Sequence, residues 1–86
     1  MNEFLELRNR YQKKKENNEC NNKQIEFLDT FMDDDFCFLR INEKQALNII
    51  CFLGIPKEKA YKYYKEILLA MLQEMKRSKK NNKESL

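Results

Sequence analysis

The sequence predicts a mainly α-helical protein, a small bundle of about four helices with at most one short strand at 36–41. Apolar residues recur at steps of three and four along most of the chain, which places them on one face of a helix. One glycine and one proline are the only strong helix breakers. With 86 residues and a hydrophobic content of 42%, the chain can form one small core. We expect a single helical domain at 1–77 and a basic disordered tail at 78–86.

The first two helices are expected at 2–16 and 23–32. Asn2 is a favoured N-cap, and the first helix buries an apolar face of Phe4, Leu7 and Tyr11. The asparagine-rich stretch between the two helices predicts a loop. The apolar residues of the second helix are Ile25, Phe27, Leu28, Phe31 and Met32. Three aspartates at 33–35 favour its end, because carboxylates are unfavourable at the negative end of the helix dipole.

The segment at 36–41, FCFLRI, is the one strand candidate, because it is short, aromatic and hydrophobic. A single strand is not stable alone. It must pair with another chain or with an irregular segment of its own, or it is no strand and crosses the core in extended form.

Two further helices are expected at 43–53 and 56–77, joined by a short turn that forces them to pack at a steep angle. Asn42 and Gln45 have the spacing of a capping box. Gly54 is the expected left-handed cap of the third helix, and Pro56 suits the first position of the next one. The long helix carries an apolar stripe of Ala60, Tyr64, Ile67, Leu68, Met71, Leu72 and Met75.

The segment QALNIICFLGIPKEKAYKY resembles a helix-turn-helix motif. In that motif, a glycine allows positive φ in the turn, and apolar residues on either side lock the two helices together. Gly54, Leu53 and Ile55 fit this pattern. Ile50 departs from it, because a small residue is expected at that position. The alternative is an ordinary pair of helices joined by a glycine turn.

Basic residues are grouped at the start of the long helix and along the first helix, where they are candidates for nucleic-acid binding. The candidate residues are Lys57, Tyr61, Lys62, Lys65, Arg8, Arg10, Lys13, Lys14 and Lys15. Base edges are usually contacted by Arg, Asn or Gln, and none of these occurs between Pro56 and Leu72. We therefore expect binding mainly through phosphate contacts. The tyrosines also permit stacking on single strands, so an RNA-binding module is a further alternative.

Two other interpretations concern partner chains. Residues 36–75 have the order of a ribbon-helix-helix protomer, whose strands pair across a dimer, although the aspartates at 33–35 would repel phosphate. The long helix also shows the spacing of a coiled-coil seam, although packing within the chain is the default interpretation of such a stripe. The candidate oligomer or partner face consists of Tyr64, Leu68, Met71 and Met75.

Composition argues against catalysis and metal binding. The chain has no histidine, and its only serines are Ser78 and Ser85. A single glycine cannot form a phosphate-binding loop. Three cysteines without a CxxC pair indicate free thiols in a reducing compartment. We expect no enzyme activity, no cofactor, no metal site and no membrane segment.

The leading hypothesis is a small cytoplasmic DNA-binding protein, a helix-turn-helix-like regulator or accessory factor that acts as a homodimer. The net charge of +3 conceals basic ends around an acidic centre, a pattern that suits a polyanion. Frequent Lys, Asn and Ile, which have A/T-rich codons, add the hypothesis of a phage or plasmid origin. The alternative is a protein–protein interaction module, an adaptor or small inhibitor, that docks through the acidic residues 33–35 or the long C-terminal helix.

Overall fold

The computed structural model describes the backbone of residues 2–85 and the side chains of residues 3–77. It confirms the mainly helical fold, with four α-helices and, within residues 2–85, no strand. The elements are α1 (Asn2–Glu16), α2 (Asn22–Met32), a turn of 3-10 helix η1 (Cys37–Leu39), α3 (Glu43–Phe52) and α4 (Lys57–Ser85).

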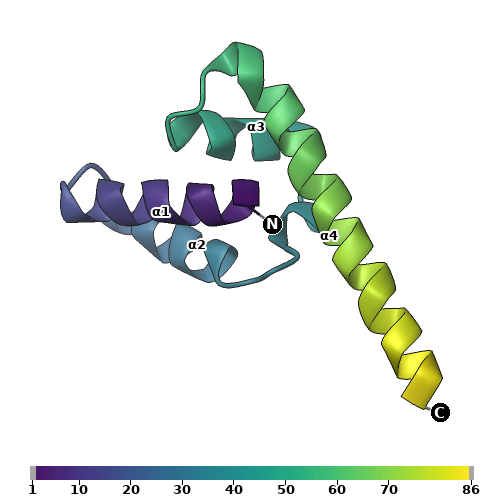
Figure 1. Ribbon diagram of the computed structural model, residues 1–86. Helices are drawn as coiled ribbons and strands as arrows, with labels where there is room; N and C mark the ends of the chain where they lie inside the picture. Colours follow the sequence, from purple (N-terminus) through teal and green to yellow (C-terminus); the bar gives the residue numbers. More distant parts are fainter. Residues whose placement is uncertain (1, 86) are drawn as a thin grey trace.

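The longest element, α4, runs across the other helices and past them. Helices α1 and α2 lie side by side, and α3 packs against the first half of α4 (Figure 1). The second half of α4 extends beyond the other helices, and the molecule measures 48 × 26 × 21 Å along its principal axes. This helix therefore has a packed half and a protruding half.

One hydrophobic core joins the four helices and η1. Phe38 of η1 is fully buried at its centre. Its ring packs edge-on against Phe4, Phe31 and Tyr64, with ring centroids 6.0, 5.2 and 6.5 Å away, respectively. The other buried residues are Leu7, Tyr11, Leu28, Met32, Cys37, Ala46, Ile50, Leu53, Ile55, Ala60, Ile67 and Met71. Within residues 3–77, no α4 side chain beyond Met71 is fully buried, so the packed half ends near this residue.

The strand candidate at 36–41 is a turn and not a strand. Residues 37–39 form η1, and Cys37 and Phe38 are both buried. Neighbours in a strand point to opposite faces, so a lone strand would have exposed one of these two side chains. The turn places both in the core, and Asp34 supports it by accepting a hydrogen bond from the Phe36 N–H at 2.9 Å. The ribbon-helix-helix interpretation is wrong, because it requires this strand.

Asparagine capping boxes start both α2 and α3. The Asn42 side chain accepts from the Gln45 N–H at 2.8 Å, and the Gln45 side chain accepts from the Asn42 N–H. The box expected at 42–45 is confirmed. An equivalent box of Asn21 and Gln24 starts α2, and the asparagine-rich composition of the preceding loop conceals it in the sequence.

The turn between α3 and α4 is a Schellman motif at Gly54. Gly54 has a φ of +99°, a conformation that residues with a Cβ atom rarely adopt. Its N–H donates to the Cys51 carbonyl at 3.0 Å, and the Ile55 N–H donates to the Ile50 carbonyl at 3.3 Å. Ile50 and Ile55 are both buried, which is the apolar pair typical of this motif. Ile50 thus has a packing role in the turn that a small residue would not fill.

Helix α4 begins at Lys57, directly after Pro56, and its backbone continues to Ser85. We expected its end at Arg77, but residues 78–85 contain neither glycine nor proline to break a helix. The side chains of the basic segment at 78–86 lie outside the described residues, and its separation from a domain at 1–77 stays a prediction. Within residues 2–85, no helix combines the length and the apolar character needed to cross a membrane.

Candidate nucleic-acid interface

Arg8 of α1 is held by contacts within the fold. Its Nη2 lies 3.0 Å from Asp35 Oδ1, and its Nε donates to the Met32 carbonyl at 2.9 Å. The guanidinium also covers the ring of Phe4, 4.5 Å from the ring centroid. Arg8 therefore ties α1 to the end of α2, where helix carbonyls lack partners within the helix.

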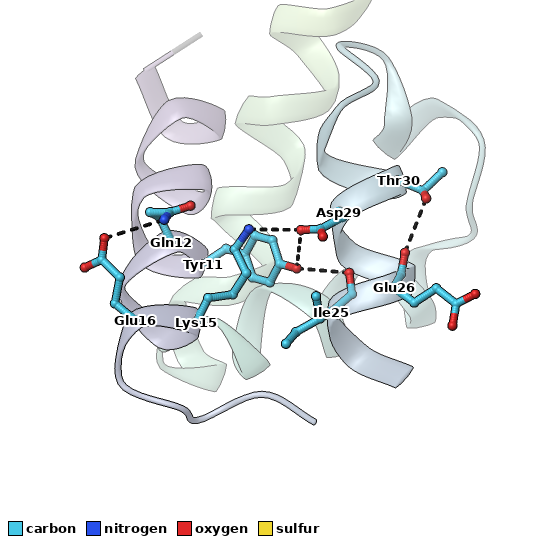
Figure 2. A network of polar contacts seen from close by, with 8 residues as sticks. All are labelled: Tyr11, Gln12, Lys15, Glu16, Ile25, Glu26, Asp29 and Thr30. Atoms are coloured by element: carbon cyan, nitrogen blue, oxygen red, sulfur yellow. Dashed lines mark hydrogen bonds and ion pairs between the residues drawn. The ribbon is translucent and has the colours of Figure 1, made fainter. Parts of the chain in front are cut away.

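Lys15 belongs to a second link between α1 and α2 (Figure 2). The Tyr11 hydroxyl donates to Asp29 Oδ1 at 2.7 Å, and Lys15 Nζ lies 3.0 Å from the same oxygen. Two hydrogen bonds lower the pKa of Asp29, and the one from Tyr11 has a larger effect than the one from Lys15. The pKa of Tyr11 is raised mainly by burial and, to a smaller extent, by its hydrogen bond to Asp29. Lys15 is thus already paired with a carboxylate.

Arg10 and Lys14 lie against the end of α3 and the turn that follows it. Arg10 Nη1 is 3.0 Å from the position that a Cβ atom would occupy at Gly54, and Lys14 Nζ is 4.9 Å from the ring centroid of Phe52. Both side chains are paired with glutamates. The partners are Glu6, 3.4 Å from Arg10, and Glu19, 3.6 Å from Lys14. Of the five candidate residues on α1, Lys13 is the one without an ion pair among the described side chains.

The candidate lysines on α4 differ from the basic residues of α1 in their exposure and ion pairing. Lys57, Lys62 and Lys65 are exposed on the first turns of the helix, and none forms an ion pair with a described residue. Glu58 and Glu66 lie one helical turn on either side of Lys62 and do not pair with it. We call Lys57, Lys62 and Lys65 the α4 lysines.

A groove of about 450 Å³ lies beside these lysines, between α3 and α4. Its lining residues are Lys44, Leu47, Asn48, Cys51, Lys57, Ala60 and Tyr61, and we call it the α3–α4 groove. None of the described side chains that line it is a carboxylate. Its α3 wall was not predicted. The signal in the sequence is the spacing of 44, 47, 48 and 51, because residues three, four and seven apart share one helix face.

The core divides the candidate partner face on α4. Tyr64 and Met71 are buried and cannot meet a partner from solvent, whereas Leu68 and Met75 are half-buried. The reason is that the coiled-coil spacing coincides with the stripe that packs on η1 and α3. The exposed apolar residues next to this face are Leu69 and Leu72.

Two of the three acidic residues at 33–35 also have partners inside the fold. Asp35 pairs with Arg8, and Asp34 Oδ2 lies 3.1 Å from Arg40 Nη1. Asp34 and Arg40 also border a pocket of about 370 Å³ between α2 and η1, which we call the α2–η1 pocket. Its other lining residues are Glu26, Phe27, Thr30, Phe31, Cys37 and Ile41.

Among the described residues, the groups that could bind metal or react as thiols are carboxylates and three cysteines. Within the described residues, no group of three or more cysteine, aspartate or glutamate side chains is placed to hold a metal ion. Cys20, Cys37 and Cys51 are free thiols, and burial raises the pKa of Cys37 to about 12.

No protein family, curated protein or solved structure matches the chain. The function must therefore be inferred from geometry and charge.

Proposed function

We propose that this protein binds DNA and that the α4 lysines contact its phosphates. The observation that carries the proposal is the exposure of Lys57, Lys62 and Lys65 on successive turns of one helix, without a carboxylate partner among residues 3–77. A lysine without a carboxylate partner has no ion pair to give up when it meets a phosphate. The glycine turn before α4 supports the proposal, because it ends α3 and leaves the start of α4 at the surface.

The residue types on α4 favour the DNA backbone over the base edges. Lysine ammonium groups contact phosphates as point charges, and residues 57–72 include no Arg, Asn or Gln to contact bases. Each neutralised phosphate steepens the log–log dependence of affinity on salt by about 0.9. If all three α4 lysines contact phosphates, they account for a slope of about 2.7.

The test is fluorescence anisotropy with a mixed-sequence DNA duplex at low and moderate salt. The triple variant Lys57→Gln, Lys62→Gln, Lys65→Gln should bind at least about tenfold more weakly at low salt and lose most of the salt dependence. The matched control removes the same charge from other exposed positions. It carries Lys23→Gln, Lys76→Gln and Arg77→Gln.

The control variant should keep most of the wild-type affinity and slope. Equal losses in the two triple variants would show that binding follows net charge and not the α4 lysines. If the wild-type protein binds neither this duplex nor its separated strands even at low salt, the proposal is wrong. Thermal melting curves, monitored by circular dichroism, establish that both variants are folded.

The alternative function, a protein–protein interaction module, is favoured by the protruding half of α4 (Figure 1). Leu69 is 58% exposed and Leu72 is 44% exposed, beside the half-buried Leu68 and Met75. Apolar side chains grouped on an uncovered helix are typical of a docking surface, and a second copy of this chain is one such partner. A pulldown with and without nuclease separates the two functions. Capture that survives nuclease and is lost in Leu72→Lys would indicate a protein partner.

A further inference from the structure

We propose that the α3–α4 groove holds an unpaired nucleotide, so that the preferred ligand is single-stranded nucleic acid. The inference rests on the proposed function and specifies the form of nucleic acid that is bound. Three features of the groove carry it. They are its size, its aromatic wall and the lysines on both of its sides.

The groove has the size and lining of a small-molecule site. Its volume of about 450 Å³ lies within the range of roughly 300–1,000 Å³ that is typical of such sites. Leu47 from α3 supplies apolar surface, and Ala60 from α4, which is only 1% exposed, also borders the groove. The bases of a duplex are stacked and present only their edges, so a base must be unpaired to enter a groove between two helices.

Tyr61 supplies the aromatic wall. Its side chain is exposed and lines the groove, and Lys65 Nζ lies over its ring, 4.6 Å from the centroid. Lys65 is not among the residues that line the groove. A base in the groove would stack on the face of the ring that Lys65 does not cover. The cation–π contact with Lys65 also favours one orientation of this exposed ring.

Polar groups around the groove match a nucleotide. Lys44 of α3 and Lys57 of α4 are exposed, and neither forms an ion pair with a described residue. Lysines from both helices can hold the phosphates on the two sides of a stacked base. Asn48 adds a side-chain amide, which can donate to and accept from a base edge.

The α2–η1 pocket provides the contrast within the same molecule. It also has an exposed aromatic residue, Phe27, which is 54% exposed and stacks on Phe31. However, Glu26 and Asp34 line that pocket, and Arg40, the one cation among its described lining residues, is paired with Asp34. Its carboxylates would repel a phosphate. An aromatic side chain and an uncompensated positive charge therefore occur together in the α3–α4 groove and not in the α2–η1 pocket.

The test compares the affinity of the whole chain for a labelled oligothymidylate with its affinity for the same strand annealed to its complement. The wild-type protein should bind the single strand about tenfold more tightly. Tyr61→Leu should abolish this preference, whereas Tyr61→Phe should retain it, because stacking needs only the ring. Phe27→Leu is the matched control, since it removes an exposed aromatic ring from the other pocket.

Four results would overturn the inference. Equal affinity for single strand and duplex, or a preference that survives Tyr61→Leu, would do so and leave the DNA-binding proposal intact. A loss in Phe27→Leu as large as that in Tyr61→Leu would also do so, because it would place the site elsewhere. Absence of binding to either ligand would overturn both proposals. Circular dichroism melting of each variant confirms that the comparison is made between folded proteins.

Discussion

Helix α1 and the start of α4 both carry clusters of positive charge, but the two regions differ in what those charges contact. On α1, Arg8 and Lys15 are each 3.0 Å from a carboxylate oxygen of another segment. On α4, Lys57 and Lys62 have no such partner among the described residues. A cation that already has an internal partner gains less from a ligand, because the new contact replaces an existing one. The number of basic residues therefore does not indicate which surface binds a polyanion.

The acidic centre of the chain explains the difference. Asp29 and Asp35 lie at the end of α2 and just after it, and both receive a basic side chain from α1. These carboxylates link two neighbouring helices, which is a structural role. The contrast between the two regions predicts that changes in α1 affect stability and that changes on the exposed side of α4 affect binding.

The largest expected effect comes from changing Gly54, which lies in the turn before α4 and beside Arg10 of α1. Gly54→Ala should lower the free energy of unfolding by about 1–3 kcal/mol, because alanine is strained at a φ of +99°. The added Cβ would also lie 3.0 Å from Arg10 Nη1, but this guanidinium is the flexible end of a side chain and can move. Urea denaturation followed by circular dichroism measures the loss.

The control for this substitution is Gly54→Asn. Asparagine tolerates positive φ better than alanine, so its loss of stability should be smaller. If Gly54→Ala is as stable as the wild-type protein, the turn does not require a left-handed residue. The Schellman motif would then be an incorrect description of how α3 meets α4.

Much of this fold could be predicted from the sequence, because its signals are local. The box at Asn42 and Gln45, the glycine at 54 and the apolar periodicity of 60–71 each act within a few residues. Residues 36–41 could not be assigned correctly in this way. FCFLRI has the composition of a strand, and only the absence of a neighbouring strand, a feature of tertiary structure, decides that it forms η1 instead.

The candidate site was less predictable than the fold. The exposure of the α4 lysines follows from their place opposite the apolar stripe of one helix. The pairing of Arg8 with Asp35 depends on how α1 packs on α2, and these residues are 27 positions apart in the chain. The groove depends in the same way on the angle between α3 and α4. Contacts between elements, and not the elements themselves, separate the basic residues that are available from those that are paired.

The contrast between the paired charges of α1 and the unpaired charges of α4 can be tested with one substitution in each region. Arg8→Gln should lower the free energy of unfolding by about 1 kcal/mol, because it loses the ion pair with Asp35 and weakens the contact with the Met32 carbonyl. Lys62→Gln should change stability by less than about 0.5 kcal/mol, because its side chain is exposed and unpaired. Denaturant titration of the two variants gives both values.

DNA binding by the same two variants should show the opposite order. Lys62→Gln should reduce the salt slope by about 0.9, and Arg8→Gln should leave it unchanged. A reduced slope for Arg8→Gln in a fully folded sample would show that this arginine contacts phosphate despite its internal partners. The distinction between the two regions would then be wrong.

The smallest expected effect concerns the link at Asp29 and depends on pH. Hydrogen bonds from Tyr11 and Lys15 lower the pKa of Asp29 below its usual value of 3.8. A carboxylate with a lowered pKa in the folded state stabilises the protein above its unfolded pKa, and this contribution is lost as the pH falls through the folded value. Asp29→Asn should therefore lower the melting temperature slightly at neutral pH, and the difference should shrink below about pH 4. Asp33→Asn is the control, because Asp33 is exposed and has no ion pair among the described residues. A difference between wild-type protein and Asp29→Asn that stays constant from neutral pH to about pH 3 would show that the charge of Asp29 does not stabilise the contact between α1 and α2.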